Sequence, residues 1–299
     1  MSNAAPVVAI VGPTASGKSA LAMSIAQRLG AEVVNADAFC LYRGMDIGTA
    51  KPSLADRRMV VHHLIDTHDV EESVEVVGYR DQARAAIEAV RSRGRTPLLV
   101  GGSGLYVQAV LDDLRFPGTD PSVRQRLEGE LAQVGPEVLH GRLAAIDPAA
   151  AEAILPSNGR RIVRALEVNE ITGASFVATL GPAQPWTRSV RIGWDPGQEA
   201  VDRAIAARVD LMWRDGFVGE VESLRERLTR ARTASRAVGY RQILDALEAG
   251  DDPDAAREPT VVATRRLARR QRAWFRRDPR VHWLQSSWQV EQILGTLEI

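Results

Sequence analysis

The chain has 299 residues, of which 45% are hydrophobic, and a formal net charge of zero. This is enough apolar material for a buried core, and the length allows one large domain or a core that carries an insertion. No apolar run approaches the roughly 20 residues of a membrane-spanning helix, and residues 1–6 lack the basic and apolar regions of a signal peptide. A cytoplasmic protein without a membrane partner is therefore expected.

Charge and cysteine content narrow the possible partners. The segment from Thr264 to Arg280 holds eight arginines and one acid, which leaves 30 basic and 37 acidic residues in the rest of the chain. A neutral total with one concentrated basic element does not exclude RNA. The single cysteine, Cys40, excludes an internal disulfide and a multi-cysteine zinc site, and it is expected to be a small buried residue.

The first hundred residues alternate between predicted strands and helices. Strands are expected at 7–11, 31–36 and 96–100, with helical spacing at 20–25 and 79–93. Buried strands that alternate with helices predict a parallel sheet covered on both faces, with ligands at the carboxyl ends of the strands. The loops that follow these strands are where the chemistry should lie.

From Asp120 the pattern becomes helical, with Pro121 at a first helical position and Asn158 as a cap for residues 160–171. Strand character returns at 189–194, and helices are expected at 200–215, 218–230 and 261–277. Residues 119–188 are therefore predicted to be an all-helical insertion, bounded by Pro117-Gly118 and the loop 181–185. The core comprises residues 1–118 and 189–299.

A glycine-rich loop joins the first strand to the first helix and follows the pattern G-x-x-x-x-G-K-[ST]. Only two of the 38 basic residues are lysines, so Lys18 in this loop is not a product of composition. Backbone N–H groups and the helix N-terminus can bind a phosphate or diphosphate, Lys18 can neutralise it and Ser19 can ligate Mg²⁺. The predicted diphosphate-binding residues are Gly12, Pro13, Thr14, Ala15, Ser16, Gly17, Lys18 and Ser19.

Two acids are candidates for a role in the chemistry. Asp37 ends the second strand beside the glycine-rich loop, where it could touch whatever reacts with the phosphate-bearing substrate, although a turn cap is the alternative. A nucleotide hydrolase also needs an acidic residue that helps to bind Mg²⁺; Asp66 could supply it, but the sequence signal for this role is weak. The fold class predicted from this arrangement is α/β, a P-loop NTPase-like parallel sheet flanked by helices.

The stretch from Asp37 to Pro52 (DAFCLYRGMDIGTAKP) resembles the signature D-S-x-x-x-Y-[KR]-G-[ML]-D-I-G-T-A-K-P of the tRNA dimethylallyltransferases. Further segments look like family blocks in family order, at residues 12–19, 97–106, 164–168, 238–242 and 264–271. The chain departs from the pattern at Ala38, where serine is common, at Phe39-Cys40, where glutamine is frequent, and at Ser103, where threonine is common. The resemblance covers nearly the whole chain.

This resemblance implies transfer of a dimethylallyl group from dimethylallyl diphosphate to N6 of the adenosine 3′-adjacent to the anticodon of tRNA, with Mg²⁺ and release of diphosphate. Asp37 would act as general base, while Lys18, Ser103 and Arg208 would stabilise the leaving diphosphate. The implied partners are the tRNA anticodon stem-loop and dimethylallyl diphosphate, and a monomer is expected. The alternatives are an adenylate isopentenyltransferase, a small-molecule kinase with this core, and a non-catalytic RNA-binding protein.

RNA contacts are expected from three regions. Arg265, Arg269, Arg272 and Arg276 recur at helical spacing on one face of the C-terminal basic segment, although a solvated basic face is the structural alternative. The helical insertion should grip the tRNA. The resemblance implies tRNA contacts at Asp37, Ala38, Phe39, Cys40, Ser103, Arg124, Arg160, Arg161, Ile162, Val163, Arg164, Arg269 and Arg272.

Overall fold

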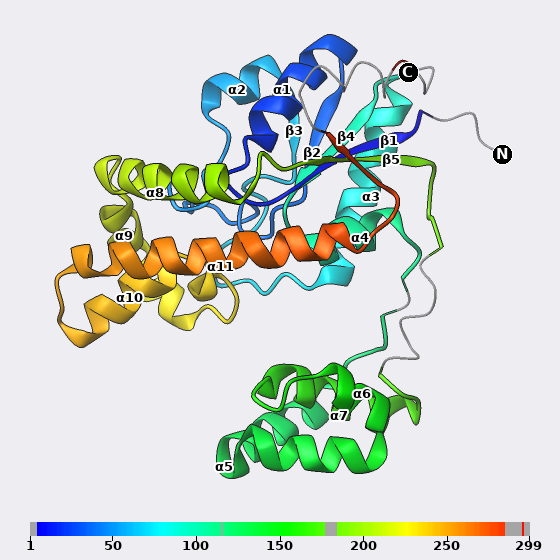
Figure 1. Ribbon diagram of the computed structural model, residues 1–299, viewed down its shortest axis with the longest axis vertical. Coiled ribbons are helices and arrows are strands. Elements are labelled where there is room, and N and C mark those ends of the chain that lie inside the picture. The colour runs from blue at the N-terminus through cyan, green and yellow to red at the C-terminus, as the bar shows by residue number, and fades with distance from the viewer. Residues whose placement is uncertain (1–4, 115, 177–183, 285–294, 296–299) are drawn as a thin grey trace. The chain divides into compact units, whose positions relative to one another are not determined.

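The computed structural model of the chain describes residues 5–114, 116–176, 184–284 and 295 (Figure 1). The chain forms two compact units. Unit 1 comprises residues 1–111 and 185–299, and unit 2 comprises residues 112–184. Part of the loop 181–185, expected to end the insertion, lies outside the described residues.

Unit 1 is built on a six-stranded parallel sheet in the order β3-β2-β4-β1-β5-β6. The central strands β1 and β4 are buried at every residue, which explains their near-continuous apolar sequences. The predicted strands at 7–11, 31–36, 96–100 and 189–194 are confirmed, whereas β3 and β6 were not predicted. The strands are β1 (Val7–Val11), β2 (Glu32–Asn35), β3 (His62–His63), β4 (Pro97–Gly101), β5 (Ser189–Trp194) and β6 (Val281–Leu284).

Helices cover both faces of this sheet, as the alternating pattern predicted. One face packs against Ala22, Ile25 and Ala26 of α1 (Lys18–Leu29). The other packs against α3 (Val76–Ser92), α4 (Gly104–Leu111) and the end of α11 (Arg257–Arg276). All six strands run in one direction, so the loops that follow β1, β2 and β4 emerge at the same edge of the sheet.

A second apolar cluster joins four helices to the segment between β2 and α2 (Leu54–Met59). It contains side chains from α8 (Gln198–Arg214), α9 (Phe217–Arg230), α10 (Tyr240–Ala249) and α11, together with Tyr42 and Met45. In Figure 1 these helices extend to one side of the sheet. Among the described residues, no helix is long and apolar enough to cross a membrane.

Unit 2 is helical throughout its regular elements and has its own core. The helices are α5 (Pro121–Ile146), which is interrupted by non-helical Gly135, α6 (Pro148–Ala153) and α7 (Gly159–Thr172). Leu127, Leu139 and Leu143 of α5 pack against Ile162 and Leu166 of α7. Asp120 caps α5 and Asn158 caps α7, as predicted, and a hydrogen bond from Asp113 N to Gln184 O (2.7 Å) joins the two ends of the unit.

Candidate active site

The glycine-rich loop lies between the carboxyl end of β1 and the start of α1, and the end of β5 fixes its shape. A Cβ on Gly12 would lie 2.2 Å from the Trp194 carbonyl oxygen, so only glycine fits at this close approach. The Trp194 indole Nε1 donates to the Ser16 carbonyl at 2.7 Å, and Gly17 adopts a φ of 89° immediately before α1 begins. These contacts fix the shape of the loop.

Gln271 is a site residue to which the sequence motifs assigned no role. Its side-chain Oε1 accepts a hydrogen bond from Thr14 N at 2.7 Å, and a Cβ on Gly102 would lie 2.5 Å from its side-chain nitrogen. The buried Gln271 amide therefore lies between the loop after β1 and the loop after β4. Its place in the block 264–271 was the only sequence signal that could have identified it.

The Lys18 ammonium lies against the loop, where it donates to the Pro13 carbonyl at 3.2 Å. Burial lowers the pKa of Lys18 to about 8, with Arg208 acting in the same direction and Asp37 opposing the shift. Burial likewise lowers the pKa of Arg208 in α8, again against the influence of Asp37. Two enclosed cations and one carboxylate therefore influence one another, which suits the binding of an anion.

Asp37 follows β2 in a tight turn. Its Oδ1 accepts from Phe39 N at 3.0 Å, and Asn35 fixes the backbone by accepting from Asp37 N and donating to Asp37 O, both at 3.0 Å. The turn-capping role left open by the sequence is therefore present. Among the described residues Oδ2 receives no hydrogen bond, so only one of the two carboxylate oxygens holds the turn.

Ser103 faces this turn as well as the loop after β4. Its hydroxyl accepts from Ala38 N at 3.4 Å, and its own backbone N–H donates to Ala36 O at 3.4 Å. A Cβ on Gly101 would lie 2.2 Å from the Ala36 carbonyl, so the end of β4 packs closely on the end of β2. Ser103 thus helps to position the backbone beside Asp37.

A pocket lies beside Asp37 and Arg208. Its lining includes Thr14, Asp37 and Arg208, together with Gly48, Thr49 and Ala50 of the signature segment. The rest of the lining is largely apolar and comes from α8, α9, α11 and the segment before α10, with Ile205, Val209, Met212, Phe217, Ala237, Val238 and Leu267. The lining therefore combines the charged Asp37 and Arg208 with a largely apolar remainder.

Asp66 forms a cluster of ion pairs with Lys51 of the signature segment and with Arg57. Lys51 Nζ donates to Asp66 Oδ1 (2.5 Å), to Asp46 Oδ1 (2.7 Å) and to the Tyr42 carbonyl (2.5 Å), and Arg57 pairs with the other Asp66 oxygen at 2.7 Å. Burial alone would raise the pKa of Asp66, but the hydrogen bonds from Lys51 and Arg57 outweigh it and lower that pKa. Asp66 is thus engaged as an ion-pair partner rather than as a second metal acid.

Cys40 is buried, as the sequence analysis expected of a lone cysteine. Burial, followed by the nearby Asp37 carboxylate, raises the pKa of its thiol well above the ordinary value. Cys40 therefore stays a protonated, small apolar residue.

The arginines of α11 divide into two groups. Arg272 makes a bidentate pair with Asp195 at 2.5 and 2.7 Å, Arg276 lies 3.7 Å from Asp195, and Arg265 and Arg269 lie 4.0 and 3.8 Å from Asp202. The face that the helical spacing assigned to RNA thus faces two acids near the start of α8. Arg272 is largely enclosed there, whereas the Arg269 side chain is 59% exposed.

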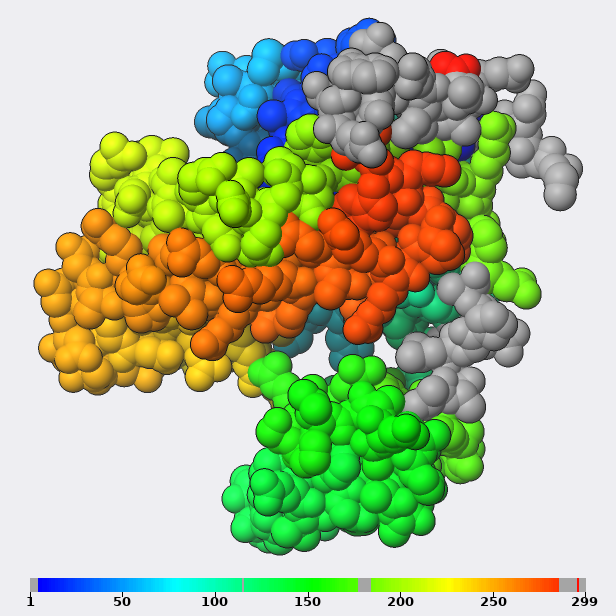
Figure 2. All heavy atoms as spheres, in the orientation of Figure 1, coloured from blue at the N-terminus to red at the C-terminus, as the bar shows by residue number. Residues whose placement is uncertain are grey.

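A second group of arginines consists of Arg266 and Arg270 of α11 and Arg277, which follows the helix, with Trp274 between the last two. All four are exposed, and the three arginines form no ion pair within the part of the chain that the structure describes. Trp274 covers Gly104, where a Cβ would lie 2.2 Å from the indole. Figure 2 shows α11, in orange and red, as a surface ridge of unit 1.

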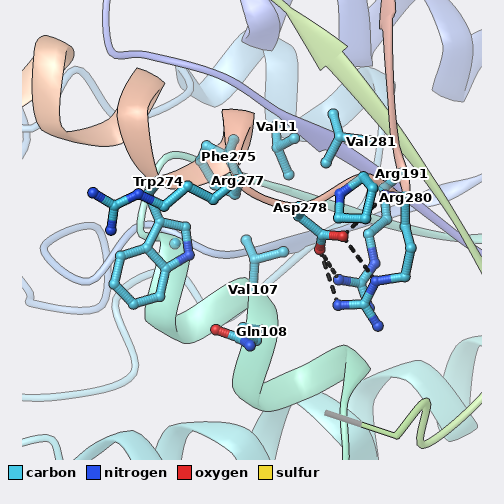
Figure 3. A pocket seen from close by; sticks show the side chains of 12 residues that line it. Val11, Val107, Gln108, Arg191, Trp274, Phe275, Arg277, Asp278, Arg280 and Val281 are labelled. Carbon is cyan, nitrogen blue, oxygen red and sulfur yellow. Dashed lines mark hydrogen bonds and ion pairs between the residues drawn. The ribbon is translucent and has the colours of Figure 1, made fainter. Parts of the chain in front are cut away.

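A cavity of about 370 Å³ lies at the end of this ridge (Figure 3). Trp274, Arg277 and Gln108 line one side of it. On the other side, Asp278 pairs with Arg191 at 2.5 Å and with Arg280 at 2.8 Å, which ties β5 to the segment before β6. The cavity combines the exposed Arg277 with the aromatic surface of Trp274.

The RNA contacts expected from unit 2 have different environments. Arg160 and Arg161 are exposed at the start of α7, whereas Ile162 and Val163 are buried in the core of unit 2. Arg124 and Arg164 both bind the buried Glu167 carboxylate, and Arg164 also donates to the carbonyls of Pro117 and Gly118. Arg160 and Arg161 are therefore the side chains of this set most open to a ligand.

Comparison with known proteins places this site in a family. Residues 40–278 match the family model described as IPP transferase. The tRNA dimethylallyltransferase of Salinispora arenicola is 57% identical over 285 residues, which is 95% of this chain and 83% of that protein. That of Kineococcus radiotolerans is 58% identical over 287 residues, covering 93% of this chain and 90% of that protein.

A solved structure agrees with these sequence relatives. The full-length tRNA isopentenylpyrophosphate transferase from Bacillus halodurans superposes with a TM-score of 0.71 at 36% identity, over 98% of this chain and 95% of that chain. The P-loop NTPase-like fold and the family predicted from the motifs are both confirmed. The chain belongs to the IPP transferase family.

Proposed function

We propose that the protein is a tRNA dimethylallyltransferase that moves a dimethylallyl group from dimethylallyl diphosphate to N6 of the adenosine 3′-adjacent to the anticodon. The pocket supports this function best. Its lining combines Thr14 of the glycine-rich loop, Asp37 and Arg208 with a largely apolar set of side chains. A diphosphate attached to a short branched hydrocarbon matches both parts of that lining.

The chemistry at the acceptor follows from Asp37. The N6 lone pair is delocalised into the purine, so the amine is a weak nucleophile whose proton becomes acidic only as the new N–C bond forms. As N6 attacks C1 of the dimethylallyl group, the C1–O bond breaks and its electron pair stays on the diphosphate. The free oxygen of Asp37 takes the N6 proton and later passes it to water.

The leaving diphosphate gains negative charge on its bridging oxygen. Loop amides between Gly12 and Ser19, the Lys18 ammonium and the Arg208 guanidinium would stabilise that charge. Because Arg208 and Lys18 are partly buried, water screens their charges less than it screens those of exposed side chains, so they would act more strongly on a bound anion. Ser103 holds the turn beside the base and would contribute indirectly.

A magnesium ion fits this proposal through Ser19, whose hydroxyl is exposed at the first turn of α1. No three His, Cys, Asp or Glu side chains gather as a metal-binding group among the described residues, which suits a cation that takes most of its ligands from phosphates and water. When bound, Mg²⁺ would neutralise diphosphate charge.

RNA recognition would use both units. An adenine stacked in an anticodon loop cannot reach an enclosed carboxylate, so the nucleotide must leave the stack at a cost of a few kcal/mol. In unit 1 we place phosphate contacts on Arg266, Arg270 and Arg277, with Arg269 also open to RNA. In unit 2 we place them on Arg160 and Arg161. We further propose that the enzyme acts as a monomer in the cytoplasm, where its tRNA substrates are found.

A transfer assay tests the function. The protein is incubated with Mg²⁺, labelled dimethylallyl diphosphate and an anticodon stem-loop that has adenosine 3′ to the anticodon. We expect label on N6 of that adenosine, located by nuclease digestion and mass spectrometry, and none on AMP. A stem-loop with guanosine at this position is the matched control. Label on AMP instead of RNA would establish an adenylate isopentenyltransferase, and ATP turnover without prenyl transfer would establish a kinase.

The exposed arginines Arg266, Arg270 and Arg277 give a second prediction. Replacing Arg266, Arg270 and Arg277 together by alanine should weaken stem-loop binding and reduce the slope of log K against log salt by up to about three, since each arginine that neutralises a phosphate releases about one counterion. Fluorescence anisotropy at several salt concentrations measures this slope.

The matched control replaces three exposed arginines on other helices, Arg58, Arg214 and Arg241. This variant loses the same net charge but should retain most of the salt dependence. Equal slopes for the two triple variants would remove Arg266, Arg270 and Arg277 from the RNA interface.

A further inference from the structure

The signature segment from Asp46 to Ala50 forms one wall of the reactive pocket but belongs to no helix or strand. Gly48, Thr49 and Ala50 line the pocket beside Asp37 and Arg208. The segment is coiled, with the Thr49 hydroxyl donating to Met45 O at 2.5 Å and Ala50 in the left-handed region at a φ of 50°. An irregular backbone in such a place needs support from elsewhere in the fold.

That support comes from Glu220 on α9. Its carboxylate accepts from three consecutive backbone N–H groups, those of Asp46 (2.9 Å), Ile47 (2.8 Å) and Gly48 (3.2 Å). The Tyr240 hydroxyl donates to the same carboxylate. One side chain more than 170 positions away in the sequence thus satisfies three adjacent amides that no regular element could pair.

Tyr240, the first residue of α10, supports the segment in a second way. Its ring packs edge-to-face on Phe217, with centroids 4.9 Å apart, and a Cβ on Gly48 would lie 2.4 Å from the Tyr240 ring and 2.2 Å from that of Phe217. Burial and the adjacent Glu220 carboxylate raise the pKa of Tyr240 far above its ordinary value, so its hydroxyl remains a donor. Gly48 can therefore be only glycine here.

We propose that Glu220 and Tyr240 act together as a clamp that positions the 46–50 wall against the reacting group. Neither residue lines the pocket, so they are positioning residues and not catalytic ones. The proposal rests on the proposed function for its kinetic consequence, because a shift of about 1 Å in a wall that orients a substrate can reduce turnover as much as a hundredfold. It also gives the block 238–242 a role that the sequence did not reveal.

The test compares Glu220→Gln with Glu222→Gln, an exposed glutamate on the same helix. Gln at position 220 places an NH₂ group against backbone N–H donors, so the amides of residues 46–48 should exchange with deuterium at least tenfold faster. The kcat for stem-loop prenylation should fall about 10- to 100-fold. The pyrophosphate dissociation constant should change less than twofold, because the glycine-rich loop is untouched. Glu222→Gln should match the wild type in all three.

Tyr240→Phe is the second variant, and it keeps the test possible if Glu220→Gln folds poorly. It retains the ring on Gly48 and removes only the O–H group, so we expect a smaller loss of kcat, about three- to tenfold. Amide exchange is measured without substrate, so it tests the clamp even if the proposed function is wrong. Failure of the wild type to prenylate RNA would overturn the proposed function alone. Unchanged exchange at 46–48 in both variants would disprove the clamp. Faster exchange with unchanged kcat, or a fall in kcat matched by an equal weakening of pyrophosphate binding, would disprove positioning.

Discussion

Asp37→Asn should reduce turnover by a factor of about 10²–10⁴ while stem-loop binding stays within a few-fold of the wild type. The expected loss is that of a general base, since an amide cannot take the N6 proton. The structure makes the test selective, because Asn keeps an Oδ1 that can accept from Phe39 N and so preserves the turn. Single-turnover kinetics with saturating dimethylallyl diphosphate measure the effect, and anisotropy measures RNA binding.

Asp37→Ala serves as the control for the turn, because it removes both the proton acceptor and the hydrogen bond to Phe39. If Asp37 were only a turn cap, the asparagine variant would retain near-normal turnover and the alanine variant alone would be impaired. If Asp37 is the base, both variants lose turnover and only the alanine variant also loses stability. An active asparagine variant would therefore disprove the catalytic role.

Lys18→Met should reduce turnover about 10²–10³-fold and at the same time stabilise the fold. The loss follows from the missing positive charge at the departing diphosphate. The stability gain follows from burial, which lowers the pKa of Lys18 from 10.5 to about 8. At pH 7 both folded and unfolded chains carry the proton, but the folded chain must enclose the charge, a cost on the order of 1–3 kcal/mol. Chemical denaturation of both proteins measures this difference.

The lowered pKa of Lys18 also predicts how the free energy of unfolding changes with pH. Between about pH 8 and pH 10.5 the unfolded chain binds more protons at position 18 than the folded chain, so wild-type stability should rise with pH over this range. Lys18→Met should lack that rise, and the two unfolding free energies should converge. In the wild type kcat/KM should fall above about pH 8 as free enzyme loses the ammonium. Parallel stability curves for the two proteins would contradict the burial argument.

The sequence predicted those parts of the fold that repeat a local pattern. The apolar runs at 7–11 and 96–100 became the buried central strands, and Asp120 and Asn158 became helix caps because capping is a short-range hydrogen bond. Strand β3 has only two residues, both histidines, and carries no period that a search could detect. Its position is set by pairing with β2, which is a long-range contact.

The site residues also divide into those that a local sequence pattern identifies and those that depend on long-range contacts. Lys18 and Asp37 could be identified because their motifs are contiguous, but Gln271, Glu220 and Trp194 act on segments more than 170 residues away. Helical spacing also placed Arg265, Arg269, Arg272 and Arg276 on one face without revealing that Asp195 and Asp202 lie opposite. A period gives the relative direction of side chains and not what they face.

The hydrogen bonding of Lys51 makes the two lysines distinguishable to an amine-reactive reagent. The Lys51 side chain is 2% exposed and all three of its ammonium protons have acceptors, so acylation must wait for the segment around it to open. Lys18 lies where diphosphate would bind, so its labelling should be blocked by occupancy of the loop. Mass spectrometry of two peptides after a brief pulse of reagent would therefore report ligand binding at one lysine and local unfolding at the other.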